Sequence, residues 1–141
     1  MNKNGEIIII EDDTDDQFLM EQAFETLEYT NKRVYFADGL DALEYLHSSD
    51  TLPFLILSDI NLPKLNGFEL RKKLSNDAEL NLKCIPYLYL TTAGNQEAVI
   101  DAYSSSAQGF FVKATKFSEL QEMLQTIIGY WKKCSAPNDF D

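Results

Sequence analysis

The sequence is poor in the residues that cross-link a small secreted domain or hold a transition metal. Its 141 residues include two cysteines, one histidine and four prolines. Cys84 and Cys134 form no CxxC motif and have no histidine beside them, so we expect two free thiols rather than a disulfide or a zinc site. A chain of this length buries a hydrophobic core without such cross-links. The scarcity of cysteine favours a reducing, cytoplasmic setting.

Long apolar runs and positive charge are also scarce. The N-terminal apolar run at 7–10 is too short for a signal-peptide core, and no stretch approaches the roughly 20 apolar residues of a membrane span. Lys and Arg together number 12 against 23 for Asp and Glu, a formal net charge of −11. An acidic chain disfavours binding to nucleic-acid phosphates and to anionic membrane surfaces. We therefore expect a soluble protein with neither nucleic acid nor membrane as a partner.

Short apolar runs alternate with longer amphipathic segments. Continuous apolar runs predict five buried strands, at 7–10, 33–37, 54–58, 85–90 and 109–113. Apolar residues spaced by three and four predict five helices, at 15–28, 40–46, 68–76, 96–106 and 117–133. This alternation predicts an α/β fold, a doubly wound parallel sheet with helices on both faces. The polar residues 135–141 are typical of a frayed tail.

Polar side chains come where the predicted strands end. Glu11 and Asp12 follow the first strand, Asp59 the third, Thr91 the fourth, and Lys113 ends the fifth. Ligand sites in doubly wound sheets lie outside the carboxyl ends of the strands, so we expect these groups to converge. Clustered carboxylates repel one another, and a divalent cation such as Mg²⁺ removes that cost. A carboxylate beside Mg²⁺ and a lysine is a candidate phosphoryl acceptor.

Motifs at these positions resemble the receiver domains of two-component response regulators. They are IIIIEDD at 7–13, FLILSDINLPKLNGFEL at 54–70, YLYLTT at 87–92 and GFFVK at 109–113, with ADGLDALEYL at 37–46 similar to the family's second helix and its approach. The resemblance spans roughly residues 6–133. It implies a flavodoxin-like fold with strand order 2-1-3-4-5. We expect a stand-alone receiver over 1–134, with the tail 135–141 and no output domain.

The resemblance also implies roles around the acceptor. It implies that Asp59 takes the phosphoryl group and also binds Mg²⁺. Asp12 binds the same ion directly, Glu11 helps through a metal-bound water, and Asn61 offers its backbone carbonyl. Pro63 and Gly67 match the turn that follows the acceptor, where we expect the glycine to supply a backbone conformation that other residues resist.

Switching and partners follow from the same resemblance. It implies that Thr91 is the switch hydroxyl, that Lys113 pairs with a phosphoryl oxygen, and that Phe110 is the switch aromatic. The implied phosphoryl donor is a sensor histidine kinase or a histidine phosphotransfer protein. The implied output is contact with a downstream protein or onward transfer in a phosphorelay. The long apolar last helix leaves a homodimer open.

Three features depart from the family pattern. Ala114 stands where the family usually has a proline joined by a cis peptide bond. A cis bond before alanine costs about 2.5–4 kcal/mol, so we expect a trans bond and a reshaped loop. Phe110 has no hydroxyl, so its switching is steric only. Thr92 and Ala93 offer no acid or amide to position a water, which predicts slow self-dephosphorylation.

Two alternatives remain at this stage. A degenerate receiver acting as a constitutive binding module is compatible with Ala114. A phosphohydrolase with an aspartyl nucleophile usually carries a second aspartate two residues later, where this chain has Asn61. Asp13 is expected to cap the first helix, and the lone His47 is assigned no role.

Overall fold

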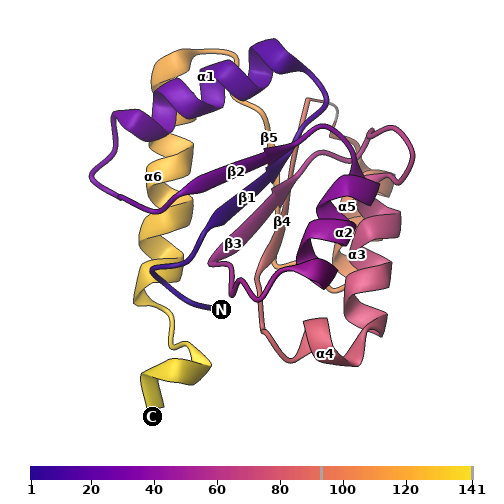
Figure 1. The fold of residues 1–141 in the computed structure, drawn as a ribbon. Helices are drawn as coiled ribbons and strands as arrows, with labels where there is room; N and C mark the ends of the chain where they lie inside the picture. The colour runs from indigo at the N-terminus through magenta and orange to yellow at the C-terminus, as the bar shows by residue number, and fades with distance from the viewer. Residues whose placement is uncertain (93, 141) are drawn as a thin grey trace.

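One parallel sheet organises the chain. The computed structural model describes residues 1–92 and 94–140. The strands are β1 (Ile7–Ile10), β2 (Arg33–Phe36), β3 (Leu55–Ser58), β4 (Tyr87–Thr91) and β5 (Gly109–Val112). They pair in parallel in the order β2-β1-β3-β4-β5, which confirms the predicted fold class and strand order (Figure 1). Because every strand runs the same way, all five carboxyl ends lie at one edge.

Helices cover both faces of this sheet. α1 (Thr14–Glu25) and α6 (Phe117–Lys133) lie together on one face (Figure 1). The other face carries α2 (Gly39–Ser48), α3 (Gly67–Asn76), the short α4 (Ala78–Asn81) and α5 (Gln96–Ser104). A 3-10 helix, η1 (Pro137–Phe140), follows α6. No helix within the described ranges is long and apolar enough to cross a membrane.

The four isoleucines of β1 show why the sheet needs two helical layers. Ile7 and Ile9 pack into the core beneath α1 and α6, while Ile8 and Ile10 pack into the core beneath α2 and α3. Side chains alternate across a strand, so a run of four apolar residues is buried only when both faces are covered. All residues of β1, β3 and β4 are buried, whereas the edge strands β2 and β5 are largely half-buried.

Capping side chains fix where the helices next to the carboxyl edge begin. The Asp13 carboxylate accepts hydrogen bonds from the backbone N–H groups of Asp15 and Asp16, at 2.8 and 3.2 Å. This confirms the expected cap of α1. At α3, Asn66 and Glu69 form a reciprocal capping box. Both caps hold short loops between a strand end and a helix start, so the polar groups on those loops have defined positions.

Several predicted boundaries were wrong. α1 ends at Glu25 rather than at residue 28, because the Thr26 hydroxyl donates to the Ala23 carbonyl at 2.7 Å and closes a turn. β4 begins at Tyr87 rather than at residue 85, since Pro86 has no N–H to donate to a ladder. The sequence also gave no sign of α4, which begins where the Asp77 carboxylate accepts from the backbone N–H of Leu80 at 2.9 Å.

In the described part of the C-terminal tail, residues 135–140, the chain forms η1 and packs back on the protein, which differs from the frayed segment expected from the sequence. Ala136 is buried, and its N–H donates to the Asp139 carboxylate at 2.7 Å. The same carboxylate lies 3.2 Å from the Lys3 ammonium. Lys3, near the N-terminus, therefore holds the tail, and a local sequence pattern does not reveal a contact between residues so far apart in the chain.

Candidate functional site

The predicted site residues come together at the carboxyl edge of the sheet. Glu11 and Asp12 directly follow β1, Asp59 follows β3, and Thr91 is the last residue of β4. Lys113 follows β5, and its backbone N–H donates to the Thr91 carbonyl at 2.8 Å. The strand order places β1 beside β3 and β3 beside β4, so these loops are neighbours in space.

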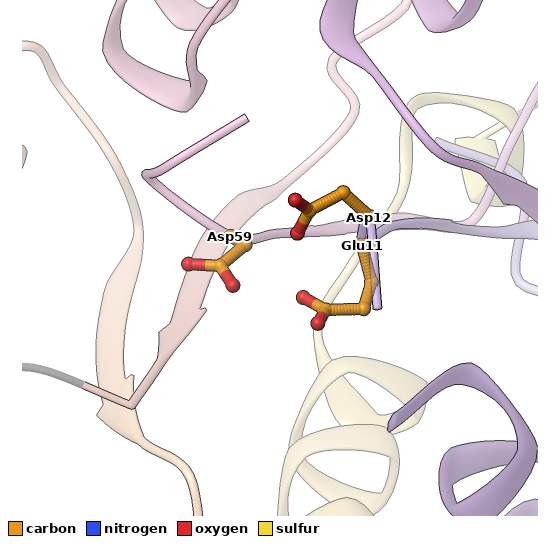
Figure 2. A group of neighbouring side chains, drawn as sticks. All are labelled: Glu11, Asp12 and Asp59. Carbon is orange, nitrogen blue, oxygen red and sulfur yellow. The ribbon is translucent and has the colours of Figure 1, made fainter. Parts of the chain in front are cut away.

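Three carboxylates form the centre of the site. One oxygen from each of Glu11, Asp12 and Asp59 lies within 4.8 Å of the other two. Figure 2 shows the three side chains at the ends of two adjacent strands, with the carboxylates of Glu11 and Asp12 extending toward the side on which Asp59 lies. Glu11 and Asp59 are buried, at 3% and 8% exposure, while Asp12 is exposed. The cluster is therefore open to solvent on the Asp12 side and enclosed on the other.

Lys113 reaches into this cluster from β5. Its ammonium nitrogen lies 2.9 Å from Glu11 Oε2, 3.1 Å from Asp16 Oδ2 and 3.3 Å from Asp59 Oδ2. Sequence reasoning gave Asp16 no role and so missed its contact with Lys113. The available signal was its place in the first turn of α1, right after the strand that ends at Glu11. One ammonium thus contacts three carboxylates, and two of these lie beside Asp12.

Burial and charge shift the pKa values in this cluster in different directions. Burial, followed by the neighbouring Asp59 carboxyl, raises the pKa of Glu11 to about 8 despite Lys113. Burial also pushes the Asp59 pKa upward, but Glu11, the Lys113 charge and the Ile60 N–H at 2.7 Å outweigh it and hold that pKa below its usual value. Desolvation lowers the pKa of Lys113, yet Glu11, Asp59 and Asp16 outweigh it and raise that pKa. A divalent cation would favour the ionised form of every carboxylate here.

The residues expected to act as switches lie on β4 and β5, the strands that end at Thr91 and just before Lys113. Thr91 is buried, at 1% exposure, and Phe110 is half-buried. The ring centroid of Phe110 lies 6.3 Å from that of Tyr89, and Tyr89 in turn lies 5.1 Å from Phe68 of α3. Thr92 is exposed. Ala93, on which the expectation of slow self-dephosphorylation partly rests, lies outside the described residues.

The loop after Asp59 differs from expectation in the role of its glycine. Gly67 does not have a positive φ; in this loop the positive φ, 64°, belongs to Lys64. What excludes a side chain at Gly67 is contact, because a Cβ there would lie 2.2 Å from the Asp59 carbonyl oxygen. The Gly67 N–H also donates to the Ile60 carbonyl at 2.9 Å. The glycine therefore lets α3 start directly against the Asp59 loop.

Asn61 and Ala114 are the other two positions singled out from the sequence. Asn61 is exposed in the loop after Asp59 and carries an amide rather than a carboxylate. The peptide bond between Lys113 and Ala114 is trans, as expected. The Lys113 ammonium still reaches Asp59 with this bond trans.

The donor set of the cluster fits a hard divalent cation. The groups that converge are carboxylates, and Mg²⁺ prefers oxygen ligands. No histidine or cysteine joins them among the described residues, so the set suits zinc or copper poorly. Three carboxylates lie around one ammonium, and Asp12 adds a fourth beside Glu11 and Asp59, so a cation would also offset negative charge that the protein leaves uncompensated.

The chain is similar in sequence and in fold to proteins that are already known. The family model described as "Response regulator receiver domain" matches residues 7–125. The response regulator Rcp1 of Synechocystis is 30% identical over 130 residues, covering 89% of this chain and 87% of Rcp1. The solved Mn(2+)-bound form of Rcp1 superposes with a TM-score of 0.80 at 29% identity, over 94% of this chain and 98% of Rcp1. The phosphorylated cyanobacterial phytochrome response regulator RcpA gives a TM-score of 0.84 at 28% identity, over 94% and 97% of the two chains.

Proposed function

The chain belongs to the family of response regulator receiver domains, signalling proteins of two-component systems, and from that premise we propose that Asp59 accepts a phosphoryl group. The observation that carries the proposal is the position of its carboxylate. Asp59 Oδ2 lies 3.3 Å from the Lys113 ammonium and beside two further carboxylates at the carboxyl edge of the sheet. Asp59 Oδ1 is fixed by the Ile60 N–H at 2.7 Å, which leaves Oδ2 as the attacking atom.

Receiver domains bind Mg²⁺ in an acidic pocket, and the solved Rcp1 structure holds Mn²⁺. We propose that Asp12, Asp59 and the backbone carbonyl of Asn61 hold the ion here, with Glu11 acting through a water. When bound, the ion offsets charge on the transferring phosphoryl oxygens. Lys113 contributes a second positive charge from the opposite side, and the buried site strengthens its effect.

Phosphorylation would change the charge that Thr91 faces. A phosphoryl group on Asp59 carries strong acceptor oxygens, and the Thr91 hydroxyl lies at the end of the strand next to β3. We propose that this hydroxyl moves toward the phosphoryl group and that the half-buried ring of Phe110 follows it. The result is a shift in population between two states of the face formed by α5 and β5.

Receiver domains interact with histidine kinases and with downstream targets. For this chain we propose a sensor histidine kinase or a histidine phosphotransfer protein as donor, with a cytoplasmic location where kinases have ATP. The output is then phosphorylation-dependent contact with another protein, or onward transfer to a histidine. The Asn61 amide cannot serve as a general acid or base, which favours an acceptor over a phosphohydrolase with turnover.

Phosphotransfer from a kinase tests this proposal. A panel of histidine kinase domains is first labelled with radioactive ATP, and each is then mixed with the protein. We expect label to move to the wild type in Mg²⁺, to stay on the kinase in EDTA, and to stay there with Asp59→Asn. Label that reaches Asp59→Asn as fast as it reaches the wild type would contradict the assignment of the acceptor.

A further inference from the structure

A cavity lies at the edge of the sheet opposite the carboxylate cluster. Its volume is about 410 Å³, and its walls come from the amino-terminal approaches to β4 and β5, from α3 and α4, and from the C-terminal segment. Leu74, Leu80 and Ile85 give it apolar walls, and Trp131 with Pro137 closes one side. In Figure 1, α4 and the C-terminal segment both lie at the lower end of the molecule, on the right and on the left of the view. Cavities of about 300–1,000 Å³ are typical of small-molecule sites.

Among the described residues that line this cavity, Arg71 of α3 has the one charged side chain, and Met1 adds the N-terminal ammonium. Arg71 is 8% exposed, and its Nε and Nη2 atoms donate to the backbone carbonyls of Ser105 and Ser106, at 3.2 and 2.8 Å. Its guanidinium carbon also lies 5.6 Å from the ring centre of Tyr87. Within residues 1–92 and 94–140 it forms no ion pair with any carboxylate.

A buried arginine without a carboxylate is unusual, because burying a charge costs free energy unless it is paired. Two hydrogen bonds use two of its five N–H donors. Nη1 makes none with the described residues, yet none of their buried side-chain nitrogens or oxygens lacks a partner. Nη1 is therefore not fully buried, and Arg71 is among the residues that line the cavity. In a protein of net charge −11, the cation is left for a ligand.

We propose that this cavity binds a small organic monoanion, such as a medium-chain monocarboxylate, with its acid group on Arg71 and its apolar body against Leu74, Leu80 and Ile85. Arg binds carboxylates in a forked geometry, whereas the Met1 ammonium, which also belongs to a lining residue, donates to the Lys83 carbonyl. The apolar walls exclude a ligand that is polar throughout. Gln108, whose side-chain oxygen accepts from the Tyr87 N–H at 2.8 Å, also lines the cavity and leaves its amide N–H groups for the same acid group.

The protein carries its own reporter for this site, because Trp131 is its single tryptophan and lines the cavity. Octanoate is titrated into the full chain while Trp131 emission is followed, and 1-octanol serves as the neutral probe of the same length. We expect a saturable change with octanoate and an affinity at least tenfold weaker for octanol. The Asp59→Asn protein should bind octanoate as the wild type does, so this result stands apart from the phosphorylation chemistry.

Two variants test the charge of Arg71 and the apolar wall separately. Arg71→Gln keeps polar donors for the Ser105 and Ser106 carbonyls but removes the charge, and we expect at least a tenfold loss of octanoate affinity with octanol unchanged. Ile85→Phe narrows the cavity without touching the arginine and should weaken both probes. Equal affinity for octanoate and octanol in the wild type would overturn the proposal, and so would the absence of saturable binding. If Ile85→Phe bound both probes with wild-type affinity, that result would also overturn the proposal. This outcome does not depend on whether Arg71→Gln folds.

Discussion

At the scale of single residues, the charge around Lys113 determines what the site can bind. Its ammonium lies within 3.3 Å of oxygens from Glu11, Asp16 and Asp59, and its side chain is only 12% exposed. A buried charge that loses its partner destabilises a protein strongly. Lys113 is therefore the counter-charge of the cluster, and the proposed divalent cation would share that role.

The Lys113→Met variant tests this charge balance through the free energy of unfolding. We expect the free energy of unfolding in EDTA to fall by about 2–4 kcal/mol, because the carboxylates lose their ammonium. Millimolar Mg²⁺ should restore part of that loss, and it should bind the variant more tightly than the wild type. Urea titrations with and without Mg²⁺ measure both effects. Lys116→Met, at an exposed helix cap without a side-chain hydrogen bond, is the control. If Mg²⁺ stabilised the wild type more than it stabilised Lys113→Met, Lys113 would not be the counter-charge that the cation supplements.

Two adjacent aspartates provide a matched pair for the metal. Asp12 belongs to the carboxylate cluster, whereas Asp13 caps α1. We expect Asp12→Asn to weaken Mg²⁺ binding at least tenfold, which is about 1.4 kcal/mol. Asp13→Asn should leave the affinity unchanged, since asparagine caps helices as well as aspartate. Calorimetric titration with MgCl₂ compares them, and equal affinities in the two variants would remove Asp12 from the site.

At the scale of elements, the site depends on how closely α3 approaches the end of β3. The hydroxyls of Tyr87 and Tyr89 both donate to the Gly67 carbonyl, at 2.8 and 3.3 Å. These two hydrogen bonds anchor the first residue of α3 to β4. The loop that carries Asp59 joins the end of β3 to this anchored residue. A displacement of this helix would therefore move the proposed acceptor.

Gly67→Ala tests that approach. The added Cβ would meet the Asp59 carbonyl at 2.2 Å, so the backbone must shift. We expect a loss of about 1–3 kcal/mol in the free energy of unfolding and slower phosphorylation. Gly129→Ala is the control, because its Cβ would have only the Tyr29 hydroxyl at 3.5 Å as a neighbour, and α6 should gain about 0.5–1 kcal/mol. A Gly67→Ala variant with the stability and the phosphorylation rate of the wild type would contradict the close approach of α3 to the Asp59 loop.

The edge strand β2 is held to α1 by a polar triad. Glu21 accepts from Arg33 at 2.6 and 2.9 Å and from the Tyr35 hydroxyl at 2.9 Å. The Arg33 hydrogen bonds, with a smaller contribution from Tyr35, overcome desolvation and lower the pKa of Glu21. A carboxyl whose folded pKa is lowered stabilises the fold above its unfolded pKa, and that stabilisation disappears as the pH falls through the folded pKa.

Glu21→Gln should therefore destabilise the protein by about 1 kcal/mol at pH 7, the value expected for a pair that solvent partly screens. The difference from the wild type should shrink as the pH falls from about 4.5 through the folded pKa, because the wild-type carboxyl becomes protonated there. Urea unfolding across this pH range measures it, with the exposed Glu28→Gln as the control. A difference that stays constant with pH would show that charge has no part in the triad.

At the scale of the whole molecule, much of the fold could be predicted because the strands are unambiguous. Four consecutive isoleucines suit only a strand covered on both faces, and the strand ends then identified Glu11, Asp59 and Lys113 as neighbours. The contacts that escaped prediction join residues distant in sequence. Asp16 meets Lys113 across the sheet, and Asp139 meets Lys3.

Other features could not be predicted because they depend on tertiary packing rather than on a local sequence pattern. α4 has four residues, too few to show a periodicity, and it follows from the cap at Asp77. The need for glycine at position 67 comes from a carbonyl in a neighbouring loop, not from its own backbone angles. The cavity around Arg71 forms where α3, α4 and the C-terminal segment meet, which no single motif encodes.

The most direct test of the account is the intact mass of the protein after incubation with Mg²⁺ and a small-molecule acyl phosphate. This donor needs no kinase, so the result reports only the chemistry of Asp59, its neighbouring carboxylates and Lys113. We predict the gain of one phosphoryl group in the wild type and no gain in EDTA or in Asp59→Asn. No gain in folded wild type with Mg²⁺ present, or an equal gain in Asp59→Asn, would contradict the central claim.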